Sequence, residues 1–276
     1  MNLMELLKSA LLGLVQGITE WLPISSTGHM LLLDQFMKLE VSEAFMSMFI
    51  VVIQLGSILA LLVLYFHKLN PLSPGKSKRE KRETILLWFK VAVASLPAAV
   101  IGLLFDDKIE ALFSGAISIA TMLILYGVLF IVLEHRNKRR KAVITDINEM
   151  GYGTAALMGV FQVLALIPGT SRSGSTILGG ILLGCSRTVA AEFSFFMAIP
   201  VMFGASLLRM LKFGFVFSNS EWMILLVGTF VAFVSSILAI RFLMQYIRRN
   251  DFSVFGWYRI LLGAVVVAYF FLVRAA

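Results

Sequence analysis

Apolar runs of about 20 residues recur along the chain, which is the length that a helix needs to cross a hydrocarbon core of about 30 Å. Helices and closed barrels are the only structures that satisfy all backbone polar groups at that depth. Charged residues make up only 14% of the 276 residues and hydrophobic residues 59%, so a soluble surface could not be covered. The sequence therefore predicts an all-α polytopic membrane protein. Six runs fit complete spans, namely 43–66, 85–105, 117–134, 190–211, 221–245 and 257–273.

Two further apolar segments are too short for two spans and a turn, which need about 40 residues. They cover residues 3–37 and 151–184, and each contains a proline and a cluster of Ser, Thr and Gly near its middle. Irregular backbone is tolerated at membrane depth only where protein or a water-filled cavity satisfies it. We therefore expect two re-entrant helical hairpins, the first with a loop at 21–26 and a half-helix at 27–37.

The two halves of the chain match as repeats. The pattern G-x-x-Q at 13–16 recurs at 159–162, and in both copies a proline and a Ser/Thr/Gly cluster follow. Each copy would hold one hairpin, which returns to its own side, and three spans, which do not. The second copy must then be inserted upside down, as in many transporters with inverted-topology repeats. The sequence thus predicts a first repeat at 1–150 and an inverted second repeat at 151–276.

The charges of the loops orient this arrangement in the membrane. Most of the net charge of +8 lies in the loops 67–84 and 135–141, whereas the loop 106–110 is acidic. Loops rich in Lys and Arg stay in the cytoplasm, so both basic loops are expected inside and the acidic loop outside. Both chain termini then lie outside, and the two hairpin loops meet near the bilayer midplane. The positive charge is thereby explained without nucleic acid.

The polar residues of both hairpins gather where their second half-helices are expected to begin. Two helix N-termini with free N–H groups and positive dipole ends would form an anion site, and Arg172 would add a forked cation suited to phosphate. We expect a phosphate or diphosphate ligand there. The predicted site residues are Gln16, Glu20, Ser25, Ser26, Thr27 and His29 from the first hairpin and Gly169, Thr170, Ser171, Arg172, Ser173, Gly174 and Thr176 from the second.

Within this set, Glu20, Ser26 and His29 can supply an orienting carboxylate, a nucleophile and a base. Together with Arg172 they are the expected catalytic residues, and the others are expected to bind substrate. Glu20, helped by an oxygen of Gln16, is a candidate ligand for Mg²⁺ or Ca²⁺, which take oxygen donors. No organic cofactor is expected.

The segments QGITE at 16–20, PISSTGH at 23–29 and PGTSRSGST at 168–176 resemble the signature motifs of the undecaprenyl-diphosphate phosphatase family, of the bacitracin-resistance type. The resemblance includes both motifs, their order, the repeats and the chain length. It implies a multi-pass phosphatase of the bacterial inner membrane, reached by its substrate from the periplasmic side. The reaction would be hydrolysis of the acid anhydride undecaprenyl diphosphate to undecaprenyl phosphate and inorganic phosphate. This recycles the lipid carrier for peptidoglycan synthesis, and hence supports cell shape and bacitracin resistance.

Residue by residue, the resemblance places the E/Q-x-x-x-E motif on Gln16 and Glu20, the serine and histidine on Ser26 and His29, and the phosphate-holding arginine on Arg172. Some family members have glutamate at the first of these positions. Glutamine there weakens a two-carboxylate metal site and favours a mechanism centred on serine.

The residues leave several alternatives open. A transporter or flippase of an anionic polyprenyl phosphate would use the same inverted repeats and anion site. Ser25 and Thr27 could be helix caps rather than ligand contacts, Glu20 and Arg172 a structural ion pair, and Gln16 and Gln162 hydrogen bonds that fix the hairpins. The oligomeric state is also open, with a homodimer as one arrangement.

Overall fold

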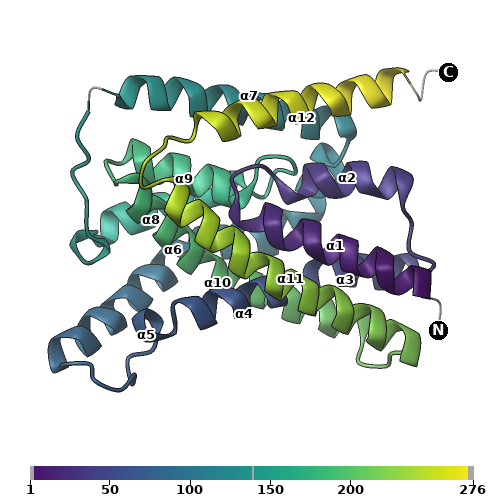
Figure 1. Cartoon of the computed structure of the whole chain (residues 1–276), viewed down its shortest axis with the longest axis horizontal. Coiled ribbons are helices and arrows are strands. Elements are labelled where there is room, and N and C mark those ends of the chain that lie inside the picture. The colour runs from purple at the N-terminus through teal and green to yellow at the C-terminus, as the bar shows by residue number, and fades with distance from the viewer. Residues whose placement is uncertain (1–2, 139, 273–276) are drawn as a thin grey trace.

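The computed structural model describes residues 3–138 and 140–272, which fold into a helical bundle (Figure 1). The helices are α1 (Leu3–Trp21), α2 (Ser26–Phe36), α3 (Glu43–Val52), α4 (Gln54–Leu64), α5 (Phe66–Leu69), α6 (Lys78–Phe113), α7 (Ala116–Asn137), α8 (Tyr152–Leu164), α9 (Arg172–Leu182), α10 (Arg187–Phe213), α11 (Asn219–Tyr246) and α12 (Ser253–Leu272), with a 3₁₀ turn η1 (Ile147–Glu149) before α8.

The predicted all-α class and the six predicted spans are confirmed. Six helical segments of the described chain are long and apolar enough to cross a membrane. They are Glu43–Leu64, Lys78–Phe105, Ala116–Asn137, Arg187–Phe213, Asn219–Tyr246 and Ser253–Phe271. The first is made of α3 and α4, which are separated at Ile53.

The predicted loops on both sides of the second span were wrong in part. The helix α6 begins at Lys78, within the predicted loop 67–84, and it continues through 106–110 to Phe113. A capping box starts it early: Ser77 Oγ accepts from the N–H of Glu80, and the Glu80 carboxylate accepts from the N–H of Ser77. Such reciprocal bonds satisfy two otherwise free donors, and the Lys, Arg and Glu that follow are good helix formers.

Both short apolar segments form helical hairpins, α1 with α2 and α8 with α9. The first helix of each hairpin packs against the other half of the chain: α1 packs along α11, and α8 packs along α6. Glycines allow these close crossings: a Cβ on Gly13 would overlap the carbonyl oxygen of Gly228, and one on Gly159 would overlap that of Ala94. The helices α7 and α12 lie against each other and cover one side of both hairpins (Figure 1).

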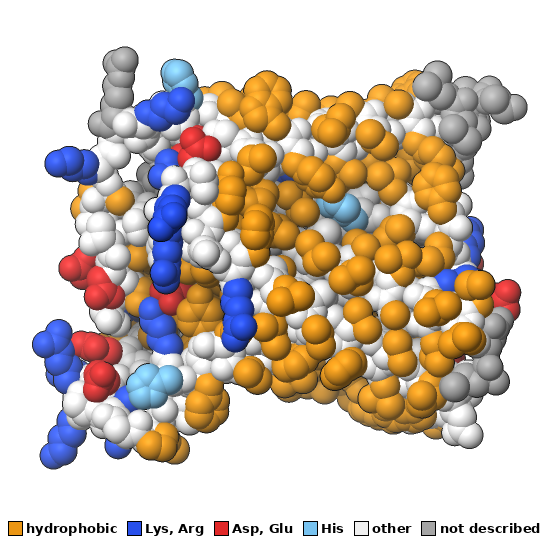
Figure 2. Space-filling model, viewed as in Figure 1, with side chains coloured by type: hydrophobic (Ala, Val, Ile, Leu, Met, Phe, Trp, Pro, Cys, Tyr) orange, Lys and Arg blue, Asp and Glu red, His pale blue; other side chains and the backbone are white. Residues whose placement is uncertain are grey.

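The molecule has one strongly basic end. In Figure 2 hydrophobic side chains cover most of the visible face, and Lys and Arg gather at the left end. That end holds the α5–α6 connection, the end of α7 and the α11–α12 connection, whereas α1 begins and α12 ends at the opposite end (Figure 1). The core lies around α9 and α10, where residues 173–181 and 189–199 are buried.

Candidate functional site

The turns of the two hairpins have the same unusual backbone at corresponding places. Ser25 precedes α2 with φ 72° and Ser171 precedes α9 with φ 70°, a region that residues other than glycine seldom occupy. Each serine is the N-cap of its helix. Ser25 Oγ accepts from the N–H of Gly28 at 3.4 Å, and Ser171 Oγ accepts from the N–H of Gly174 at 3.2 Å. The two predicted half-helix starts are therefore built alike.

A buried arginine of α12, Arg259, fastens both turns to the rest of the bundle. Its side chain is fully buried, and its guanidinium lies 5.5 Å from the ring centroid of Tyr126. It donates to backbone carbonyl oxygens of both turns and of α7, namely Pro23, Gly169, Thr170, Met122 and Leu123. The two bonds to Gly169 and Thr170 are 2.9 Å long. One side chain thus fixes the position of one hairpin turn relative to the other.

Arg259 was not among the predicted site residues, although its place in the sequence carries a signal. It is the one charged residue within the apolar run of the last predicted span, and such a residue by default suggests a functional role. The sequence does not show which carbonyls Arg259 contacts, because these partners lie between 89 and 236 positions away in the chain.

The two hairpins meet through Glu20 and Arg172. Arg172 Nη2 donates to Glu20 Oε1 at 3.0 Å, and its Nη1 donates to the carbonyl oxygen of Ser194 at 2.8 Å. Gln16 Nε2 donates to the other carboxylate oxygen of Glu20 at 2.9 Å. The guanidinium also lies 5.6 Å from the ring centroid of Trp21. The arginine is therefore held in one orientation, with its buried Nε still lacking a hydrogen-bond partner.

Several predicted binding residues instead make contacts within the protein. Ser173 Oγ bonds the carbonyl oxygens of Glu20 and Leu22 at 3.1 and 3.2 Å. Thr176 Oγ1 donates to the carbonyl oxygen of Arg172 at 2.8 Å and lies 2.6 Å from Ser194 Oγ. Both side chains hold α9 in place, and neither lines the cavities described next.

A cavity of about 210 Å³ lies between the hairpins. Of the predicted residues, it is lined by Glu20, Ser26, Thr27, Gly169, Ser171 and Arg172. A second cavity of about 590 Å³ shares Ser26 and Thr27 and also includes Gln16. It extends to Glu110 and Arg209, near the end of the molecule where α1 begins. The two hydroxyls thus stand where an inner cavity meets an outer one.

Two glutamines of the cavities were not assigned to the site by the sequence analysis. Gln54, in the middle of an apolar span, lines both cavities, and Gln162 lines the inner one. Both side-chain amide atoms of Gln162 are buried without a hydrogen-bond partner. Thr170 Oγ1, in the turn before α9, is also buried and unpartnered, but Thr170 does not line the inner cavity. Buried polar groups are normally satisfied, so the unpaired amide suggests a ligand.

His29 lies apart from this group and lines neither cavity. One ring nitrogen, Nδ1, is 2.8 Å from the carbonyl oxygen of Ser25, and Nε2 is 2.7 Å from the hydroxyl of Tyr258 on α12. The imidazole also stacks on the Tyr258 ring. Since a carbonyl can only accept, Nδ1 carries a proton. In this conformation the contacts of the ring do not include Ser26.

For a metal ion, the cavities offer mostly neutral oxygen atoms. No group of three or more His, Cys, Asp or Glu is placed to hold a metal in residues 3–138 and 140–272. Among the described residues of the inner cavity, Glu20 supplies the one carboxylate, and amide oxygens come from Gln54 and Gln162. This set fits a hard cation such as Mg²⁺, which often uses one or two carboxylates plus phosphate and water oxygens.

Comparison with known proteins identifies the same family that the sequence motifs resemble. The family model described as "Bacitracin resistance protein BacA" matches residues 9–265. The undecaprenyl-diphosphatase of Acetivibrio thermocellus is 60% identical over 272 residues, which are 99% of this chain and 100% of the relative. That of Enterococcus faecalis is 58% identical over 96% of this chain and 97% of its own length. Undecaprenyl-diphosphatase 1 of Clostridioides difficile is 58% identical over 98% of each chain.

Proposed function

The chain belongs to the bacitracin resistance protein BacA family, and from this we propose how its two hairpins carry out the reaction. It is a multi-pass membrane hydrolase that converts undecaprenyl diphosphate to undecaprenyl phosphate and inorganic phosphate. This recycles the lipid carrier for peptidoglycan synthesis and supports bacitracin resistance. The observation that carries the proposal is the contact of Glu20 with Arg172 beside one cavity that Ser26 also lines. A transporter is not favoured.

We propose that the hairpins are re-entrant and that the two halves are inverted repeats. Three observations support this. Corresponding serines cap α2 and α9 with the same φ, and each hairpin packs its first helix on α11 or α6 of the other half. The basic residues gather at one end of the molecule (Figure 2). By the positive-inside rule that end is cytoplasmic, so the outer cavity and both termini face the periplasmic side.

In this proposal the diphosphate enters through the larger cavity, and its terminal phosphate reaches the inner one. Arg172 and the first N–H groups of α9 bind the phosphate and the charge that develops on it during transfer. The unpaired amide of Gln162 donates a further hydrogen bond. Glu20, bonded to both Arg172 and Gln16, keeps the guanidinium fork oriented.

The chemical step is transfer of the terminal phosphoryl group to Ser26 or directly to water. If Ser26 Oγ attacks phosphorus, the bridging P–O bond breaks, undecaprenyl phosphate leaves, and water then releases inorganic phosphate from the serine. A base must accept the proton of the attacking hydroxyl. His29 can take this role only when Nε2 leaves the Tyr258 hydroxyl, so we propose a side-chain rotation of His29 before transfer.

A divalent cation fits beside these groups. Glu20 and the amide oxygen of Gln16 would hold Mg²⁺ or Ca²⁺ with phosphate and water oxygens completing its shell. When bound, the ion would neutralise charge on the diphosphate. Arg172 remains the fixed cation that the chain itself supplies.

Phosphate release from undecaprenyl diphosphate by the purified Ser26→Ala protein tests this proposal. We expect turnover to fall by about 10³-fold or more, as for other nucleophiles that act with a base. Thr121→Ala is the matched control, because this exposed hydroxyl of α7 bonds only its own helix. Near-normal turnover of Ser26→Ala would move the attack to water or His29. Carriage of the lipid across vesicles without phosphate release would instead favour a transporter.

A further inference from the structure

A further cavity lies at the basic end of the molecule, away from the hairpin turns. Its volume is about 620 Å³, and it is bounded by the ends of α7, α9, α10 and α11 and by the loop after α7. It shares no lining residue with the two cavities of the proposed reaction. We propose that this basic pocket binds the phosphate headgroup of an anionic glycerophospholipid of the adjacent leaflet.

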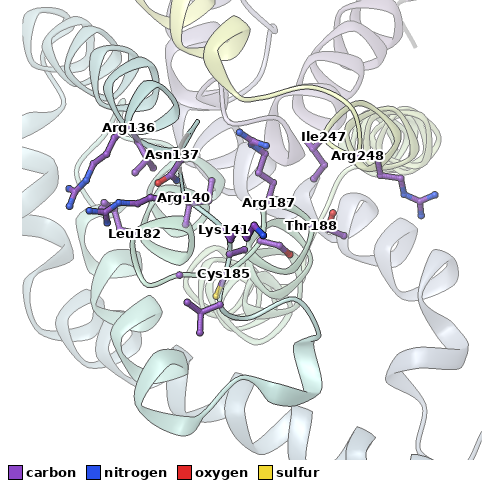
Figure 3. A pocket seen from close by; sticks show the side chains of 16 residues that line it. Arg136, Asn137, Arg140, Lys141, Leu182, Cys185, Arg187, Thr188, Ile247 and Arg248 are labelled. Carbon is purple, nitrogen blue, oxygen red and sulfur yellow. The ribbon is translucent and has the colours of Figure 1, made fainter.

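The lining of the basic pocket carries five basic side chains, of which one is paired with a carboxylate. Its basic side chains are Arg136, Arg140, Lys141, Arg187 and Arg248, and no Asp or Glu of the described residues lines it. Figure 3 shows Arg136 and Arg140 on one side of the pocket, Arg248 on the other, and Lys141 and Arg187 between them. Such a cluster between helix ends attracts anionic headgroups.

The carboxylate of Glu134 is paired with Arg187, which also interacts electrostatically with Asp251. Glu134 is fully buried, accepts from Nε and Nη2 of Arg187, and also accepts from the N–H of Phe252 at 3.1 Å. Within the described part of the chain, the other four basic side chains of the pocket form no ion pair. The pocket therefore keeps several uncompensated cations.

The backbone around the pocket is held in place rather than loose. The N–H groups of Val143 and Ile144 donate to the carbonyl oxygen of Gly184 at 2.9 and 3.0 Å, and that of Ser186 donates to Ile144 at 2.8 Å. These bonds join the loop after α7 to the turn between α9 and α10. A preformed site loses less entropy when it binds a ligand.

The apolar part of the lining favours a lipid over a soluble phosphate. Val143 and Leu182 line the pocket with 81% and 48% of their surface exposed, next to the basic side chains. The pocket also lies at the ends of three helices that are apolar enough to span a membrane. A lipid would contact the basic side chains through its headgroup phosphate and the apolar side chains through the first carbons of its acyl chains. Inorganic phosphate would contact only the basic side chains.

The test measures lipid binding to the full-length protein in zwitterionic detergent by native mass spectrometry. Dioleoylphosphatidylglycerol is the probe, and dioleoylphosphatidylcholine is the reference lipid without net charge. We expect the wild type to prefer the anionic lipid. The triple variant R136Q/R140Q/K141Q should lose this affinity about 100-fold, from about fivefold for each basic side chain near a headgroup.

The matched control is K78Q/K81Q/R82Q, which removes the same charge from exposed positions of the first turns of α6, outside the pocket. We expect it to bind within about twofold of the wild type, since salt at about 0.1 M screens exposed charges that lie more than roughly 10 Å from the headgroup. An equal loss in both triple variants would overturn the proposal. So would complete displacement of the lipid by excess inorganic phosphate, which would indicate a site for soluble anions.

We expect the triple variant to fold, because the three substituted side chains are exposed and lie outside both reaction cavities. Phosphatase turnover provides an independent check of folding. The triple variant should therefore keep wild-type phosphatase turnover in detergent. If it unfolds, the single variant Arg140→Gln takes its place, with about a fivefold loss of lipid affinity expected. Unchanged lipid binding by Arg140→Gln would then contradict the proposal.

Discussion

The two hairpin turns share a backbone conformation but differ in the side chains that they place on it. Ser25 and Ser171 have nearly equal positive φ values and cap their helices in the same way. At the next position the first hairpin has Ser26 and the second has Arg172, and both line the inner cavity. The same scaffold therefore presents a hydroxyl from one side and a cation from the other.

The hairpins also differ in burial. In α9 every residue from Ser173 to Ile181 is buried, whereas Thr27 near the start of α2 is exposed; Ser26 and Arg172 themselves are both half-buried. The tighter packing of α9 suits the division of roles that we propose. A cation that stabilises developing charge works best when it is fixed, and the reactive hydroxyl must remain accessible to substrate and water.

A third difference lies one turn before the loops. Gln16 has Glu20 four residues later and donates to it, while the corresponding Gln162 has Leu166 at that spacing and no side-chain partner. The first glutamine is hydrogen-bonded within the protein, whereas the buried amide of the second has no hydrogen-bond partner. The two hairpins thus differ at positions that the predicted repeat treats as equivalent.

The largest expected effect comes from removing the cation of the second hairpin. In Arg172→Gln the phosphate loses its charged donor, and Glu20 keeps only Gln16. We expect kcat/KM for phosphate release to fall by about 10³-fold, and Arg172→Lys to recover part of this loss because it restores charge without the two-armed contact. A kcat/KM of Arg172→Gln within tenfold of the wild-type value would contradict the proposed division of roles between the hairpins.

The next effect concerns the residue that joins the two turns. Arg259→Met keeps similar bulk but leaves the carbonyls of Pro23, Gly169 and Thr170 without their donor. We expect the free energy of unfolding to fall by about 3 kcal/mol, since each unsatisfied buried group costs about 1–3 kcal/mol. Turnover should fall by about 100-fold, because small displacements of reacting groups are that costly. Thermal unfolding measures the loss of stability, and phosphate release measures the loss of turnover.

Arg187→Met is the control for that variant. It leaves the buried Glu134 unpaired and should destabilise the fold by a similar amount, about 3–5 kcal/mol. Its site is at the basic end, so the folded fraction should keep normal turnover. Equal turnover of folded Arg259→Met and Arg187→Met would show that Arg259 has no positioning role.

A smaller effect distinguishes the two glutamines. In Gln162→Leu an unsatisfied amide disappears, so stability should stay the same or rise by about 1 kcal/mol, while kcat/KM falls about tenfold with the lost donor. Gln16→Leu should lower both the free energy of unfolding and kcat/KM, because the Glu20 carboxylate loses a hydrogen-bond donor. Unfolding midpoints and phosphate release are measured for both variants. Unchanged kcat/KM for Gln162→Leu would leave the amide without a role in binding.

The smallest effect tests whether the turns are equivalent in structure. Ser25→Ala and Ser171→Ala each remove a helix cap and should each cost about 1 kcal/mol of unfolding free energy. The glycine variants should cost less, since glycine accepts positive φ without strain. Chemical denaturation in mixed micelles gives these values. A marked loss at one turn and none at the other would contradict the structural equivalence.

Local patterns were enough to predict much of this molecule. Hydrophobic length gave the spans, and the serine clusters gave the starts of α2 and α9. The sequence also placed Glu20 and Arg172 in one predicted site, and the structure brings them to 3.0 Å. All these features depend on residues near one another in sequence or on the repeat.

Contacts between distant side chains could not be predicted in the same way. His29 and Tyr258 are 229 positions apart, and nothing in either apolar helix signals their contact. The free amide of Gln162 is likewise a result of packing. The early start of α6 was in principle visible, because Ser77 and Glu80 have capping-box spacing, but the dense Lys and Arg there suggested a loop.

The most direct test of the central claim, that one cavity is built from both hairpins, is thiol labelling of Ser26→Cys. The native Cys185 is buried, and burial raises the pKa of its thiol to about 11, so it stays largely unreactive at neutral pH. We expect methylenediphosphonate to protect the new thiol from a water-soluble alkylating reagent, and the added substitution Arg172→Gln to abolish that protection. Protection that persists with Arg172→Gln would show that the hydroxyl and the cation do not hold the same phosphate.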